Sequence, residues 1–172
     1  FADGTRTSAT DPNGIQFTMQ YDARGRLIRT NNPDGTASTR SFNECTIFGC
    51  ENGTGPNELI LIDKTLDTSG GTITEQWTYT DELLRPLVVS RQTLNWGWNR
   101  VNFEYDKERN LKRQTAPFWW GGGTQYWTQY TYDRLNRPTQ VSRPISDSDP
   151  TLQYQNTYYE GLKTRMVDAN GK

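Results

Sequence analysis

The sequence lacks histidine altogether, has only two cysteines, and contains no apolar stretch long enough for a membrane-spanning helix. Without histidine, Ser-His-Asp and Cys-His catalysis are excluded, and so are most transition-metal sites. No glycine-rich phosphate loop precedes a predicted helix. The formal net charge of -1 argues against a nucleic-acid-binding protein, which usually has a basic face. We therefore expect no cofactor, no metal, no nucleic-acid partner and no membrane span.

Helical patterns are also scarce, because no window shows sustained apolar spacing of three and four residues. Hydrophobic residues make up only 32% of the chain, whereas aromatic residues make up 12%. Apolar and polar residues alternate instead, in TITEQWTYT (72–80), RVNFEYD (100–106), TQYWTQYTYD (124–133) and LQYQNTYY (152–159). Alternation rich in Thr, Tyr, Trp and Val is typical of half-buried strands. The sequence therefore predicts an all-β fold.

A tyrosine–aspartate pair recurs along the chain. Its copies are Tyr21-Asp22, Tyr105-Asp106, Tyr132-Asp133, the weaker Thr80-Asp81 and the degenerate Tyr159-Glu160-Gly161. The acidic positions 81, 106, 133 and 160 are 25, 27 and 27 residues apart. A nearly fixed period of this size indicates a repeat architecture. Because a catalytic pair needs one site rather than five copies, recurrence favours a structural role for these carboxylates, although a paired-carboxylate glycosidase is not excluded by composition.

The fullest copy, Asp-x-x-Gly-Arg at 22–26, predicts a tight turn between two strands. Asp22 can accept hydrogen bonds from backbone amides further along, and Gly25 or Asn136 can adopt a positive φ. Since Leu84 and Arg109 occupy that place in two copies, we expect a relaxed turn there. A second turn type, rich in Pro, Asp, Asn and Gly, is predicted at 11–14, 32–35 and 168–171. Each unit is thus predicted to be one hairpin, with two alternating turn types.

The remaining repeat positions have predicted structural roles as well. We expect the tyrosine to pack across strands and the arginine after the turn to pair with the aspartate of its own or the next unit. The predicted repeat-turn residues are Tyr21, Asp22, Gly25, Arg26, Asp81, Arg85, Tyr105, Asp106, Tyr132, Asp133, Asn136, Arg137, Tyr159, Glu160 and Gly161.

Residues 41–71 break the rhythm and are predicted to be an irregular insertion, a long loop followed by one further hairpin. Cys45 and Cys50 lie within it, in NECTIFGCENG. Their spacing is compatible with a local disulfide in an oxidising compartment or with two reduced thiols, and both alternatives stay open.

The segment YDARGRLIRTNNPDGT (21–36) resembles the YD-repeat of rearrangement-hotspot (Rhs) proteins, which also occurs in insecticidal toxin complexes and teneurins. The resemblance covers almost the whole chain apart from about 41–70. It implies consecutive antiparallel hairpins that form a strip of a hollow shell around a toxin domain or other cargo. The repeats are then scaffold without catalysis, and the enzyme is a separate domain. On this basis residues 1–172 are expected to be a single YD-repeat segment of a longer, secreted or cell-surface protein.

Two further expectations concern partners. Sugars stack on tryptophan, so a carbohydrate-binding β module is the alternative function, using Trp96, Trp98, Trp119, Trp120 and Trp127 with a glycan as partner. The competing interpretation is that these rings fill the space between hairpins.

The other expected partners are the neighbouring repeats of the parent chain and an enclosed toxin domain. The open sheet edges also predict a dimer or larger homo-oligomer of the isolated chain.

Overall fold

The computed structural model describes residues 5–44, 59–94, 97–146 and 149–172. All regular elements in these ranges are β-strands, and no helix occurs among them. The chain divides into two compact units, Phe1–Trp98 and Asn99–Lys172, and each is described by itself. The predicted all-β class and the succession of antiparallel hairpins are confirmed.

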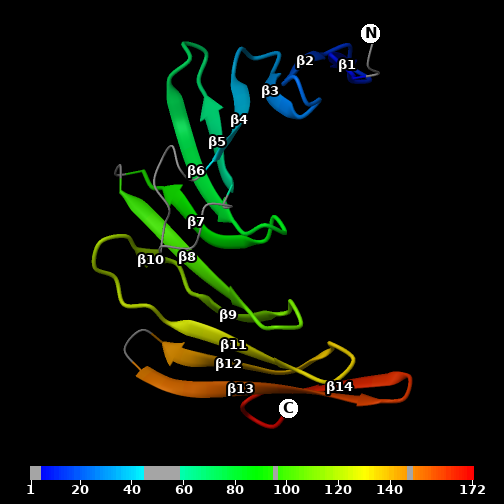
Figure 1. The fold of residues 1–172 in the computed structure, drawn as a ribbon, viewed down its shortest axis with the longest axis vertical. Coiled ribbons are helices and arrows are strands. Elements are labelled where there is room, and N and C mark those ends of the chain that lie inside the picture. Colours follow the sequence, from blue (N-terminus) through cyan, green and yellow to red (C-terminus); the bar gives the residue numbers. More distant parts are fainter. Residues whose placement is uncertain (1–4, 45–58, 95–96, 147–148) are drawn as a thin grey trace. The chain divides into compact units, whose positions relative to one another are not determined.

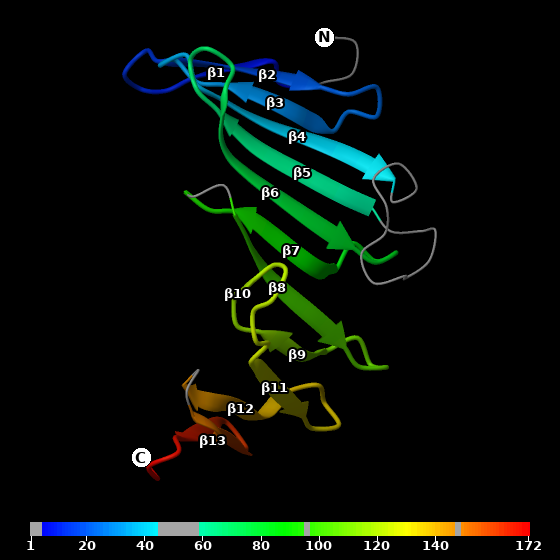
Figure 2. The same ribbon diagram turned by 90° about the vertical axis from the view of Figure 1, so that its left-hand side faces the viewer.

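The first unit is a meander in which each strand pairs antiparallel with the next one along the chain (Figures 1 and 2). Its strands are β1 (Ser8–Thr10), β2 (Gln16–Tyr21), β3 (Leu27–Asn31), β4 (Ala37–Glu44), β5 (Leu59–Leu66), β6 (Thr72–Thr80) and β7 (Pro86–Gln92). The strand β5 and the turn that follows it lie inside the range 41–71, which the sequence predicts to be an insertion. The connection between β4 and β5 falls where the repeat period would place a further YD turn.

The second unit continues the same pattern with one addition. Its strands are β8 (Trp98–Tyr105), β9 (Leu111–Thr115), β10 (Phe118–Trp119), β11 (Trp127–Tyr132), β12 (Pro138–Ser146), β13 (Asp149–Glu160) and β14 (Lys163–Val167). The order of paired strands is β8-β9-β11-β12-β13-β14, all antiparallel, and the short β10 pairs with β8 (Figure 1).

The apolar core of the first unit lies on one face of β5, β6 and β7. Ile60, Ile62, Tyr79 and Val88 are all buried, and Ile60 is fully inaccessible to solvent. The register places Ile60 opposite Tyr79 and Tyr79 opposite Val88, so these side chains share a face. Burying each such side chain contributes roughly 1.5–3 kcal/mol, which makes this cluster the main hydrophobic contribution to the unit.

Candidate functional site: the repeated aspartate turns

The turn at 22–26 closes the hairpin of β2 and β3 with two main-chain hydrogen bonds. The Gly25 N–H donates to the Asp22 carbonyl at 3.0 Å, and the Asp22 N–H donates to the Arg26 carbonyl at 2.9 Å. The Asp22 side chain adds two more, since its Oδ1 accepts from the N–H groups of Arg24 and Arg26, both at 2.9 Å. Gly25 has φ 73°, the left-handed conformation that glycine adopts without strain. The sequence-based interpretation of Asp22 and Gly25 therefore agrees with the geometry.

The same turn occurs at both ends of the hairpins, so the prediction of two alternating turn types is wrong. The pair of main-chain hydrogen bonds recurs in the described residues in turns that begin at Asp11, Asp22, Asn32, Asp67, Asp81, Asp106, Asp133 and Asp168. In the aspartate copies, Oδ1 of this first residue accepts the N–H of the residue four positions on, whereas in the Asn32 copy Asp34 Oδ1 accepts the Thr36 N–H instead. Proline at the second position fits two of these copies, at Pro12 and Pro33, without changing the turn.

The fourth position of the turn has a positive φ even where glycine is absent. Leu84 has φ 61°, Arg109 φ 74° and Asn136 φ 59°. The turns at Leu84 and Arg109 are therefore not relaxed, contrary to the prediction. A left-handed conformation costs a non-glycine residue about 1–2 kcal/mol, so the hydrogen bonds and the register of the flanking strands must offset this cost.

The arginine that ends the turn pairs with the aspartate of its own unit. The Nε–Oδ2 distance is 2.7 Å in each of the pairs Arg26–Asp22, Arg85–Asp81 and Arg137–Asp133. In the copy at 106 the Asn110 amide donates to Asp106 Oδ2 at 3.2 Å instead. The pKa of Asp133 is lowered, first by the Arg137 main-chain hydrogen bond and then by the Arg137 side chain. These carboxylates are thus occupied by contacts within their own turns.

The same arginine also contacts an aromatic ring of the following hairpin. Arg26 Cζ lies 3.8 Å from the ring centroid of Phe42 in β4, and Arg137 Cζ lies 4.1 Å from that of Tyr159 in β13. A guanidinium over an aromatic face is attractive by roughly 0.5–1 kcal/mol at exposed sites. Each of these arginines therefore joins its own turn to the neighbouring hairpin.

The tyrosine before the acidic residue forms a hydrogen bond to the preceding hairpin, whereas the arginine contacts the following one. The Tyr132 hydroxyl donates to the Leu111 carbonyl and the Tyr159 hydroxyl to the Pro138 carbonyl, both at 2.9 Å and across 21 residues. Thr80, which replaces tyrosine in its copy, donates to the Leu59 carbonyl at 3.1 Å. We call the tyrosine–carbonyl bond together with the arginine–ring contact the inter-hairpin clamp. The sequence indicated packing for these tyrosines, but the hydrogen bond to the preceding hairpin was not predicted.

The copy at Glu160-Gly161 differs from the others. Glu160 and Lys163 are directly paired, so the loop has two residues, and Gly161 has φ 63° at the first of them. This is the position where a type II′ hairpin turn requires glycine. Arg165 Cζ lies 4.4 Å from the ring centroid of Tyr158, its partner across the same hairpin, so this contact does not join two hairpins.

The tryptophans fall into two groups. Trp119 and Trp120 are 50% and 52% exposed. Trp98 is half-buried with its ring edge-on to Trp77 at 6.1 Å, and Trp127 is half-buried beneath the guanidinium of Arg113 at 4.2 Å. Sugar binding by these residues stays a prediction. Trp96, Cys45 and Cys50 lie outside the described residues.

Within the described ranges, no three or more His, Cys, Asp or Glu side chains are grouped so that they could hold a metal ion. Among the same residues, no helix is long and apolar enough to cross a membrane.

Comparison with known proteins gives a match to one family. Residues 2–37 match the RHS repeat family, while no curated protein matches the chain. The chain is similar to parts of two solved structures, a Tc holotoxin pore of Photorhabdus luminescens with a substitution in TccC3 and the TcdB2–TccC3 complex. In both comparisons the identity is 16%, the TM-score is 0.42 and 92% of this chain is covered. The chain spans only 9% and 10% of the length of those chains. The family match confirms the recognition of the YD/Rhs repeat, which it places at residues 2–37.

Proposed function

We propose that this chain is a structural segment of an RHS/YD-repeat shell that encloses a toxin domain or other cargo, and that it has no catalysis of its own. The observation that carries the proposal is the inter-hairpin clamp. The recurring aspartate, arginine and tyrosine side chains close the turns and join neighbouring hairpins, as a scaffold requires. Their carboxylates are already occupied by backbone amides and arginines, which leaves them poorly placed for acid–base chemistry.

The partners follow from the same proposal. Each unit joins the next hairpin through its own turn, so the natural neighbours are further repeats of one polypeptide and the cargo that they surround. A shell of this kind acts outside the producing cell, and we propose a secreted or cell-surface location.

We also propose that the isolated chain associates through open sheet edges. Sedimentation analysis that finds only monomers at high concentration would contradict this last point.

Protease protection tests the shell. In the full-length polypeptide that contains this segment, we expect the enclosed domain to resist a protease that digests the same domain when it is produced alone. Tyr159→Ala removes one clamp and should speed digestion, because neighbouring hairpins then separate more often. Tyr154→Ala is the matched control, since Tyr154 lies in the same strand and is 44% exposed. Digestion of the domain at the same rate with and without the repeats would overturn the proposal.

A second candidate function is carbohydrate binding, and the exposure of Trp119 and Trp120, which are consecutive in the sequence, favours it. Exposed tryptophan faces can stack on the apolar face of a sugar ring. A glycan array probed with the chain should then give signals that the double substitution Trp119→Ala and Trp120→Ala abolishes. Leu94→Ala, at a fully exposed leucine, is the control. An unchanged pattern in the double variant would exclude these rings as the site.

A further inference from the structure

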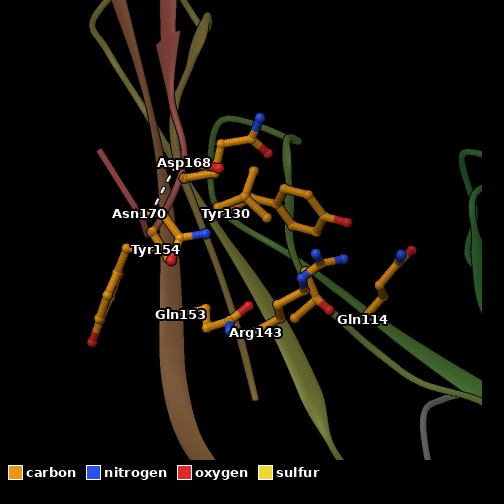
Figure 3. A pocket seen from close by; sticks show the side chains of 11 residues that line it. Gln114, Tyr130, Arg143, Gln153, Tyr154, Asp168 and Asn170 are labelled. Atoms are coloured by element: carbon orange, nitrogen blue, oxygen red, sulfur yellow. Dashed lines mark hydrogen bonds between the residues drawn. The ribbon is translucent and has the colours of Figure 1, made fainter. Parts of the chain in front are cut away.

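A polar pocket of about 480 Å³ lies on one face of the second unit, over β9, β11, β12 and β13. Its polar lining includes Gln114, Thr128, Tyr130, Arg143 and Gln153, and the turn that begins at Asp168 forms part of its wall. Figure 3 shows the side chains of Gln114, Tyr130 and Arg143 on one side of the strands and the ring of Tyr154 on the other. The volume falls within the range of roughly 300–1,000 Å³ that is typical of small-molecule sites.

The polar groups of this pocket do not satisfy one another. Within the described part of the chain, the side chains of Gln114, Thr128, Tyr130, Arg143 and Gln153 make no hydrogen bond or ion pair. They can therefore all be offered to a ligand, although water takes their place when none is bound.

Two pockets of the first unit differ from it, because in each of them an arginine pairs with a neighbouring side chain of the lining. The Arg40 guanidinium binds both carboxylate oxygens of Asp63, at 2.6 and 3.1 Å, and Arg91 Nε donates to Gln76 Oε1 at 2.5 Å. In the pocket of the second unit, by contrast, the arginine side chain is available to a ligand.

The charges of the pocket limit the ligand to a weak anion. Arg143 is the one cation among the lining residues, and Asp168 the one carboxylate. Asp168 Oδ1 already accepts from the N–H groups of Asn170 and Lys172, both at 2.9 Å, and the Lys172 hydrogen bond is the main reason for its lowered pKa. A lining with a single guanidinium and a carboxylate suits a singly charged carboxylate ligand, which the guanidinium can bind with two parallel hydrogen bonds, better than a phosphate dianion.

The neutral groups define the rest of the ligand. The amides of Gln114 and Gln153 and the hydroxyls of Thr128 and Tyr130 both donate and accept, as sugar hydroxyls require. The Tyr130 ring and Val141 supply the apolar surface in the lining. An extended peptide fits less well, because peptides of that kind bind to free main-chain groups at a sheet edge, and β9, β11, β12 and β13 are each paired with neighbouring strands on both sides.

We propose that this pocket binds a hexuronic acid, a sugar ring that carries one carboxylate. Arg143 binds the carboxylate, and the glutamine and hydroxyl side chains bind the ring hydroxyls. The ligand can be a free sugar acid or the terminal residue of an acidic glycan. This proposal does not depend on the shell function, and it uses none of the tryptophans.

Isothermal titration of the 172-residue chain tests the site with methyl glucuronide, methyl glucoside, acetate and a glucuronate-terminated disaccharide. We expect both glucuronates to bind and the glucoside and acetate to bind at least about tenfold more weakly, because each lacks half of the proposed contacts. A preference for the disaccharide over the monosaccharide would identify a glycan as the source, and equal affinity would identify a free sugar acid.

Two charge-matched variants locate the binding. Arg143→Gln should weaken the glucuronide about tenfold or more, whereas Arg134→Gln, an exposed arginine in the turn at 133–137, should leave it unchanged. Binding should also survive the double substitution of Trp119 and Trp120 to alanine. The proposal is overturned if no glucuronide binds at millimolar concentration, if acetate or glucoside binds as well as glucuronide, or if both arginine variants behave alike.

Discussion

In the unit of residues 1–98, apolar side chains of three neighbouring strands are sealed from solvent around Ile60. In the unit of residues 99–172, the buried side chains of the described residues are Arg100, Thr115 and Ser142. There the Arg100 Nε donates to Asn102 Oδ1 at 3.1 Å, and the Thr115 hydroxyl accepts the Asn102 N–H at 2.9 Å. The same hairpin can thus be held by hydrophobic burial in one place and by hydrogen bonds in another, because turns and clamps are common to both units.

Removing a core side chain should show the difference between the two units most clearly. Ile60→Ala deletes fully buried carbon atoms in the first unit and should cost about 3 kcal/mol of unfolding free energy. Ile73→Ala is the control in the same unit, since Ile73 is 55% exposed and should change stability by less than about 0.5 kcal/mol. Urea unfolding measures both, and hydrogen exchange should show the loss in strands β5 to β7. Equal losses for the two variants would contradict the core assignment.

Removing a turn carboxylate should have the next largest effect, this time in the second unit. Asp106 Oδ1 accepts the Asn110 N–H at 2.8 Å, and its Oδ2 accepts from the Asn110 amide. Asp106→Ala leaves these donors unpaired and should destabilise the chain by roughly 1–2 kcal/mol. Lys107→Ala, at the next and exposed position of the turn, should have little effect. If urea unfolding gives the same midpoint for both variants, the turn carboxylate is not needed for the hairpin.

The clamp can be tested by removing a single oxygen atom. Tyr132→Phe keeps the ring but loses the bond to the Leu111 carbonyl, and it should cost about 1 kcal/mol. Tyr154→Phe is a matched control, because the Tyr154 hydroxyl has no such bond within the described residues. Thermal unfolding monitored by circular dichroism compares the two. If Tyr154→Phe loses as much stability as Tyr132→Phe, the hydrogen bond of Tyr132 does not help to join the hairpins.

The smallest expected effect is a gain in stability. Leu84→Gly relieves a left-handed leucine that is 65% exposed and should stabilise the first unit by roughly 0.5–1 kcal/mol, after the greater freedom of glycine in the unfolded chain is included. Leu83→Gly, one position earlier and without a positive φ, should destabilise it. Asn136→Gly repeats the test in the second unit, where asparagine already tolerates the conformation, and its gain should be smaller. A loss of stability in Leu84→Gly would show that the leucine side chain makes a contact worth more than the strain.

The sequence alone predicts those features of the fold that depend on residues close together along the chain. Alternation predicted the strands, and Asp22 with Gly25 predicted a turn, because both follow from local conformational preferences. Leu84 was misjudged for a physical reason: the flanking strands impose the turn geometry, and their register outweighs the preference of a single residue. The clamp was missed because the acceptor of Tyr132 is a main-chain carbonyl, which any residue supplies. The pocket around Arg143 was missed because its lining comes from strands whose register only the folded sheet defines.

The placement of the clamps also affects how such a chain can change over time. Tyr132 and its acceptor Leu111 both adjoin tyrosine–aspartate turns, so the bonds between hairpins gather at one end of the strands. The opposite end carries connections of unequal length, five residues at 67–71 and eleven at 116–126. Changes of loop length at that second end leave the clamps in place, whereas the connection of residues 45–58 between β4 and β5 lies at the clamp end, where it takes the position of a turn. An engineer who grafts a loop would do best to choose the second end, away from the bonds that join one hairpin to the next.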